Sequence, residues 1–121
     1  MTDPFEKLTV WQMGDDLVVD IYRVTAAFPK DEKYGLALQL RRAAVSIPTN
    51  IVEGNARSHR REYIQFCHIA RGSIAEVKYL MHVCVRLQFL PLAEYELLYR
   101  RYDQLGKLLQ AMINRLQEGV E

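Results

Sequence analysis

Four segments of this chain carry apolar residues in alternating steps of three and four, and this spacing constrains the fold more than any other feature. Such steps put the apolar side chains on one side of an α-helix, where they must be buried against other helices. No stretch alternates apolar and polar residues for long enough to form a β-strand. The spacing therefore predicts an all-α protein with helices at about residues 8–28, 32–56, 59–88 and 92–118.

The breaks between these segments are short and contain residues that end or begin helices. Pro29 ends the first helix, Ser58 can cap the third, and Pro91 suits the start of the fourth. Short connections make consecutive helices antiparallel neighbours. We predict an up-down-up-down antiparallel four-helix bundle that forms one domain over residues 1–121, a length that is ample for a single core.

Pro48 lies inside the second predicted helix, where proline removes a backbone hydrogen bond and clashes with the preceding turn. The second helix is therefore expected to be kinked at Pro48, or to break into two pieces. Ser46, Thr49 and Asn50 are placed to bond the carbonyl groups that are freed. A kink that only fits the shape of the bundle and a functional hinge both remain open.

The sequence lacks the patterns of catalytic and metal sites. No Asp or Glu is followed three residues later by His, as in di-iron bundles, and no Gly-rich loop precedes a helix to hold phosphate. Cys67 and Cys84 fall on the inward side of the third helix and are expected to be core thiols, not zinc ligands. We expect no enzyme activity, no catalytic residue, no metal, no cofactor and no small-molecule substrate.

Three features of the sequence bear on where in the cell the protein is found. The chain has no apolar run of about 20 residues, the length that spans a bilayer, and its first residues do not resemble a signal peptide. With only two cysteines, a disulfide framework is not expected. The sequence predicts a cytoplasmic protein with no membrane partner.

Positive charge is concentrated in the middle of the chain, although the net formal charge is only +1. Residues 41–86 hold eight Lys and Arg against three Asp and Glu, and all three histidines. A stripe without acidic residues follows the outer side of the third helix, whose positive N-terminal end would favour a phosphate. A solvated helix face is the alternative. The predicted nucleic-acid-binding residues are Arg57, Arg60, Arg61, His68, Arg71, Lys78 and His82.

A second polar set lies mostly on the second predicted helix. Its side chains are suited to a network of hydrogen bonds and ion pairs that fixes the register between helices or subunits. A polar binding cleft is the other interpretation. The predicted set is Gln39, Arg41, Arg42, Asn50, Glu53 and Glu76.

Several motifs spread over residues 5–118 identify a family resemblance. They are Val10-Trp11-Gln12, Phe28-Pro29, Tyr34-Gly35-Leu36, the run from Gln39 to Pro48, Asn50-Ile51-Val52-Glu53-Gly54, and Ala70-Arg71-Gly72-Ser73 with Glu76. Together they resemble the bacterial four-helix-bundle proteins encoded in intervening sequences of the 23S ribosomal RNA gene. Gly14 stands where that family usually has alanine, and Val52 replaces another alanine.

The resemblance implies a left-handed bundle that assembles as a homopentamer in the cytoplasm, without known catalysis. Distant relatives are accessory proteins of reverse transcriptases in diversity-generating retroelements and engage nucleic acid through a basic surface. We therefore predict a non-enzymatic oligomer that binds RNA or DNA phosphates, with a protein-interaction scaffold as the alternative. The residues expected to face outward and to contribute to subunit contacts are Val19, Val52, Ile64, Val85 and Leu97.

Overall fold

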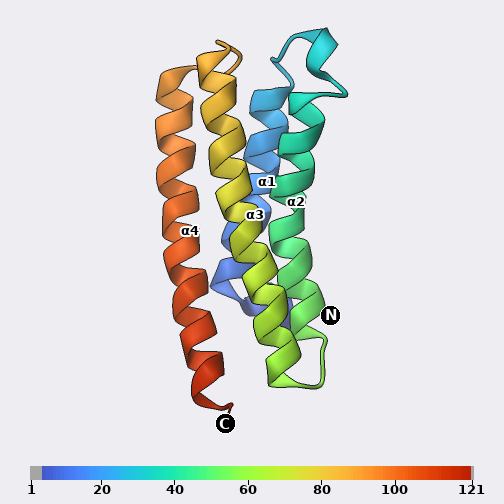
Figure 1. Cartoon of the computed structure of the whole chain (residues 1–121), viewed down its shortest axis with the longest axis vertical. Coiled ribbons are helices and arrows are strands. Elements are labelled where there is room, and N and C mark those ends of the chain that lie inside the picture. Colours follow the sequence, from blue (N-terminus) through green and yellow to red (C-terminus); the bar gives the residue numbers. More distant parts are fainter. Residues whose placement is uncertain (1–3, 121) are drawn as a thin grey trace.

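The computed structural model of this chain describes residues 4–120 and contains four long helices (Figure 1). Consecutive helices are neighbours, α1 also contacts α4, and the described part of the chain contains no β-strand. The predicted all-α four-helix bundle is confirmed. The helices are α1 (Thr9–Thr25), α2 (Leu36–Asn55), α3 (Arg60–Arg86) and α4 (Leu92–Glu118), with short 3₁₀ turns η1 (Pro4–Lys7) and η2 (Lys30–Glu32).

The connection between α1 and α2 is longer than the sequence predicted. α1 ends at Thr25, whose hydroxyl donates to the carbonyl of Ile21 over 2.7 Å. α2 begins only at Leu36, because the 3₁₀ turn precedes it and the Glu32 carboxylate accepts the Leu36 backbone N–H over 3.1 Å. Satisfying that N–H outside the helix fixes the first turn of α2.

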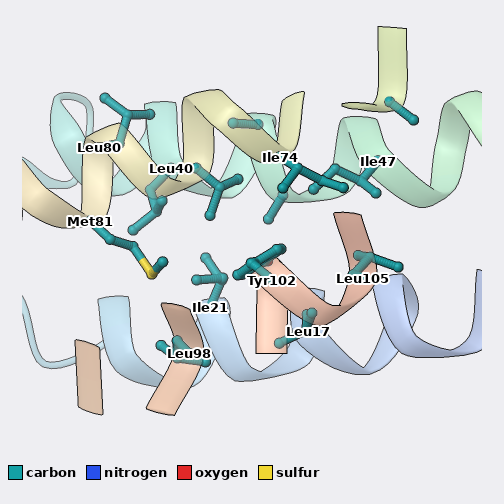
Figure 2. Close-up of a cluster of buried hydrophobic side chains, with 14 of the residues drawn as sticks. Leu17, Ile21, Leu40, Ile47, Ile74, Leu80, Met81, Leu98, Tyr102 and Leu105 are labelled. Atoms are coloured by element: carbon teal, nitrogen blue, oxygen red, sulfur yellow. The ribbon is translucent and has the colours of Figure 1, made fainter. Parts of the chain in front are cut away.

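The core lies between all four helices. Figure 2 shows Ile21 of α1 across the core from Leu40 of α2, with Met81 of α3 on the same side and Leu17 of α1 next to Tyr102 of α4. All five side chains are fully buried. The predicted apolar spacing thus identifies the side of each helix that packs inward.

α2 continues through Pro48 as one helix, so the expectation that it breaks into two pieces is wrong. The bend at Pro48 stays a prediction. Thr49 Oγ1 donates to the carbonyl of Val45 and Asn50 Nδ2 to that of Ser46, each over 2.7 Å. Neither bond reaches the carbonyl of Ala44, which is the one that Pro48 leaves without an N–H donor four residues later. Pro48 packs toward Gly14 of α1, where an added Cβ would lie 3.6 Å from the Pro48 ring.

The end of α2 packs tightly against the beginning of α3. A Cβ added at Gly54 would lie 2.8 Å from Cδ1 of Tyr63 and 2.9 Å from Cβ of Phe66. Glycine therefore allows the close approach that the short turn at residues 56–59 requires. This close approach positions the first turn of α3, where several basic residues gather.

Candidate nucleic-acid interface

The first turn of α3 has no side-chain cap. His59 is the N-cap residue in extended conformation (φ −111°, ψ 133°), and its side chain makes no capping hydrogen bond. The prediction that Ser58 caps α3 is therefore wrong, because the helix begins one residue later than a Ser58 cap requires. Backbone N–H groups at an uncapped helix start point outward and carry partial positive charge, so they suit an anion.

Basic side chains flank this helix start, although its first turn also carries the acidic Glu62. His59, Arg60 and Arg61 are exposed and line a surface hollow of about 480 Å³ together with Gly119 and Val120. Arg60 packs at the C-terminal end of α4, since a Cβ added at Gly119 would overlap its guanidinium group. The negative end of the α4 dipole favours this cation, and so offsets part of the repulsion from the α3 N-terminus.

Arg57 lies on the turn just before α3 and remains exposed. Its guanidinium carbon lies 4.9 Å from the centroid of the Phe66 ring. A cation over an aromatic face is held in place without losing its charge. The structure thus brings Arg57, Arg60 and Arg61, three of the predicted phosphate-binding residues, to one end of the bundle.

The middle of the predicted basic stripe is occupied by contacts with α4. Lys78 Nζ lies 3.0 Å from Oδ1 of Asp103 and 4.7 Å from the centroid of the Tyr99 ring. Hydrogen bonds from Lys78 and from Lys107 hold the pKa of the Asp103 carboxyl below its usual value. No acidic residue of α3 lies in the stripe, but Asp103 of α4 lies next to it. The charge of Lys78 is neutralised, and the residue is poorly placed to bind phosphate.

Three other members of the stripe lie apart from the basic cluster. Arg71 donates a hydrogen bond to the Gln110 side chain on α4. His68 is half-buried, and His82 is exposed with its ring stacked on Tyr79 at 6.4 Å between centroids. Since Arg61 and His82 are 21 positions apart, the two ends of the stripe are separated by about 30 Å.

The predicted polar network is only partly formed within the chain. Arg41 joins α2 to α1: its Nε donates to Thr25 Oγ1 over 2.7 Å, and its guanidinium lies over the Tyr22 ring. Asn50 Nδ2 also donates to Ser46 Oγ over 3.0 Å, and Ser46 Oγ lies 2.9 Å from Ser73 Oγ on α3. These contacts fix the register of α2 against its two neighbours.

The rest of that set does not join the network. Gln39, Arg42, Glu53 and Glu76 are exposed, and within residues 4–120 their side chains form no hydrogen bond or ion pair. These four residues therefore do not link helices of one chain, and the alternative that they join a network between subunits stays a prediction. Exposed polar side chains reach water more easily than a partner on the next helix.

Sequence reasoning missed an ion-pair cluster between α1 and α4, in which the carboxylate is buried and the two arginines reach solvent. Asp20 is 9% exposed and accepts hydrogen bonds from Arg23 and Arg101. The signal was an acidic residue on the inward side of the first helix, between Leu17 and Val24. Two arginines compensate the cost of burying this carboxylate.

Tyr102, next to this cluster, has a buried hydroxyl without a hydrogen-bond partner among the described residues. Burial, with a further contribution from the charge of Asp20, raises the pKa of Tyr102. The group therefore stays protonated, and it neither accepts nor donates a proton near neutral pH.

The described residues contain no group of three or more His, Cys, Asp or Glu side chains that could hold a metal ion. Cys67 and Cys84 are both free and buried, as predicted for core thiols, and burial raises the pKa of each to about 11. A thiol with so high a pKa is a poor nucleophile at neutral pH. Within residues 4–120, no helix has both the length and the apolar character to cross a membrane.

Comparison with known proteins supports the family resemblance. The model of a family described as 23S rRNA-intervening sequence protein matches residues 6–111. The crystal structure of a protein of unknown function from the S23 ribosomal protein family, from Bacteroides thetaiotaomicron, has a TM-score of 0.81 at 23% identity. That alignment covers 87% of this chain and 95% of the other and supports the fold alone. No curated protein sequence matches the chain.

Proposed function

The chain belongs to the family of 23S rRNA-intervening sequence proteins, and on that premise we propose that it is a non-enzymatic, self-associating cytoplasmic protein that binds RNA or DNA phosphates. The observation that supports this proposal is the cluster at the start of α3. His59, Arg60 and Arg61 line one hollow there, at a helix end that has no side-chain cap, and Arg57 lies on the turn just before it.

The charges of this cluster repel the positive end of α3 when no anion is bound, and a bound anion relieves that repulsion. A cation near a helix N-terminus is unfavourable by roughly 0.3–1 kcal/mol at an exposed position. A bound phosphate reverses the sign of that interaction and accepts hydrogen bonds from the uncapped N–H groups. The free energy of phosphate binding is therefore more favourable here than it would be for the same basic side chains in the middle of a helix.

The contact is expected to be insensitive to base sequence. Tyr79, the exposed aromatic residue on α3, lies near His82 and far from the arginine cluster. Phe66 is half-buried beneath the Arg57 guanidinium and offers bases no free face on which to stack, so the phosphates supply the binding energy.

The experiment compares two matched charge reversals. In Arg57→Glu/Arg61→Glu, both changes lie at the proposed site, and Arg60 is retained because it packs against the end of α4. In Arg86→Glu/Arg100→Glu, both changes are exposed and lie away from this site, in the last turn of α3 and on α4. Fluorescence anisotropy with labelled single-stranded RNA should show at least about a tenfold loss for the first variant and under about threefold for the second.

The control uses Arg100 and not its neighbour Arg101, because Arg101 forms an ion pair with the buried Asp20. Equal losses from the two variants would contradict a localised site. Far-UV circular dichroism of both variants checks that helicity is retained, as expected for exposed charges.

Self-association is supported by apolar residues on the surface. Val19 is 61% and Leu97 52% exposed, as expected for subunit contacts. Ile64, in contrast, is buried, so its assignment to the outer surface was wrong; Val52 and Val85 are half-buried. With five copies, light scattering after size exclusion should give about five times the 14.1 kDa chain mass. A monomer at micromolar concentration would contradict self-association.

A protein-interaction scaffold is the second candidate function. It is favoured by large apolar side chains that remain more than half exposed, such as Ile69, Tyr79 and Leu92. If the wild-type protein binds neither RNA nor DNA at low salt, this function replaces the first.

A further inference from the structure

A hollow of about 390 Å³ lies where the chain passes from α1 to α2, at the opposite end of the bundle from the basic cluster (Figure 1). The length of α2 separates the two places by about 30 Å. Phe28 and Ala37, both buried, give the hollow an apolar floor, and none of the described residues that line it is acidic. The volume of the hollow is in the range of small-molecule sites.

Arg41 lines this hollow and is half-buried. Its Nε donates to Thr25 Oγ1 over 2.7 Å, and its Nη2 donates to the carbonyl of Tyr22 over 3.3 Å. Both acceptors are uncharged, and a guanidinium group has more N–H donors than these two bonds use. The two bonds fix the position of the guanidinium group and leave donors for an anion.

Arg41 differs from the other half-buried cations of the chain. Within residues 4–120, three Lys or Arg residues are half-buried, namely Arg41, Lys78 and Arg101. Lys78 pairs with Asp103 and Arg101 with Asp20, whereas no carboxylate of the described chain forms an ion pair with Arg41. A cation that is partly removed from water gains more from a counter-ion than an exposed cation does.

Further positive charge surrounds the same hollow. Lys30 and Lys33 are exposed and line it, and Ala37 belongs to the first turn of α2, which carries partial positive charge. Asp31 and Glu32 lie on the same connection but do not line the hollow, and the Glu32 carboxylate accepts the Leu36 N–H instead. The hollow therefore combines an apolar floor with three cations.

We propose that this hollow binds a small organic anion in which a carboxylate or phosphate group is joined to an apolar group. The anionic group accepts hydrogen bonds from Arg41 and lies near Lys30 and Lys33, and the apolar group lies against Phe28 and Ala37. The hollow and the basic cluster share no residue. Ligand binding here therefore does not depend on nucleic-acid binding.

The first test uses phenylacetate and phenyl phosphate, which carry the two anionic groups on the same ring. Binding to the wild-type protein is followed by amide chemical shifts in NMR titrations. At least one of the two probes should bind with a dissociation constant of about 1 mM or below and should shift the amides of Ala26, Lys30 and Ala37. The probe that binds more tightly identifies the anionic group. No saturable shift with either probe would refute the proposal.

Acetate, inorganic phosphate and neutral phenylacetamide test the two parts of the ligand separately. Each should bind at least about tenfold more weakly than the phenyl anion, because it lacks either the apolar group or the charge. If phenylacetamide binds as tightly, the cations are not used. If acetate and inorganic phosphate bind as tightly, the apolar floor is not used. Either result would overturn the proposal.

The charge at the hollow is tested by Lys30→Glu/Lys33→Glu. Both positions are exposed, so the fold should be retained while affinity falls at least about fivefold. Arg100→Glu/Arg115→Glu makes the same change in net charge on α4, which does not line the hollow, and should change affinity less than about twofold. Equal losses from the two variants would show an effect of overall charge and overturn the proposal.

The location is tested without a change in charge by Ala26→Trp. Ala26 is exposed and lines the hollow, so a large side chain there should block it and weaken binding at least about tenfold. Ala27→Trp is the control, since Ala27 is exposed but does not line the hollow, and it should bind normally. Normal binding by Ala26→Trp would refute the location.

Arg41→Gln removes the half-buried charge and should also weaken binding at least about tenfold. Because Arg41 joins α2 to α1, far-UV circular dichroism checks that this variant is folded. A folded Arg41→Gln protein with wild-type affinity would refute the role of Arg41. If this variant does not fold, Lys30→Glu/Lys33→Glu and Ala26→Trp decide the outcome.

Discussion

Gly54 and Gly14 are both buried helix glycines, yet the structure predicts that replacing them with alanine changes stability in opposite directions. In Gly54→Ala the new methyl group would lie 2.8 Å from Tyr63 Cδ1 and 2.9 Å from Phe66 Cβ. Because Phe66 Cβ is attached directly to the α3 backbone, α3 itself must move. Overpacking of this kind costs about 1–3 kcal/mol. Higher helix propensity returns at most about 1 kcal/mol, so we expect a net loss of about 1–2 kcal/mol.

In Gly14→Ala the new methyl group would lie 3.6 Å from both Ile47 Cγ2 and the Pro48 ring, which is ordinary van der Waals contact. Nothing needs to move, and the unfolded chain loses conformational freedom. We therefore expect a gain of about 0.5–1 kcal/mol. The family's usual alanine at this position would then fit the bundle without other changes.

The assay is urea unfolding followed by far-UV circular dichroism, at one fixed chain concentration because oligomers unfold in a concentration-dependent way. Thermal midpoints should fall by about 4–8 °C for Gly54→Ala. If Gly54→Ala is as stable as the parent, the close approach of α2 and α3 is refuted. If Gly14→Ala loses stability, the packing described around Pro48 is refuted.

Three further changes test other features. Tyr102→Phe removes a buried hydroxyl without a described partner, so unfolding free energy should stay equal or rise by up to about 1 kcal/mol; a clear loss would show that the hydroxyl is bonded. Gln88 follows the end of α3 with φ 64°, in the left-handed region that favours glycine. Gln88→Gly should therefore raise the free energy of unfolding by about 0.5–1 kcal/mol and raise the thermal midpoint. A lower midpoint would refute this. Burial raises the pKa of Cys67 and Cys84 from 9.0 to about 11, so folding stability should be complete below about pH 9 and fall as the pH rises to 11. Denaturant titrations should show a smaller fall for the double alanine variant; the same fall in both proteins would contradict it.

The sequence predicted α3 and α4 well because a single apolar side continues through each. The predicted ranges 59–88 and 92–118 differ from the observed helices by two residues at most. The first two helices were predicted too long on the side of their shared connection. There Glu32 bonds the first N–H of α2, a contact that apolar spacing does not reveal.

The candidate site was less predictable, because its electrostatics depend on residues from other helices. Lys78 belongs to an uncompensated stripe on its own helix, but Asp103 on α4 neutralises it. Ile64 falls outside the apolar steps of α3 yet is buried, and a hollow beside it is lined by Gln117 of α4 and Val120. Apolar spacing within one helix therefore predicts which side of the helix packs inward, but not which of its charged side chains form ion pairs with a neighbouring helix.

Phosphate binding at the start of α3 is the central claim, and its most direct test is the salt dependence of RNA affinity. The dissociation constant of the wild-type protein for single-stranded RNA would be measured over a series of potassium chloride concentrations. If Arg57, Arg60 and Arg61 each neutralise one phosphate, the logarithm of the association constant should fall against the logarithm of salt concentration with a slope of about −2 per chain. A slope near zero, or no binding at the lowest salt, would contradict the claim.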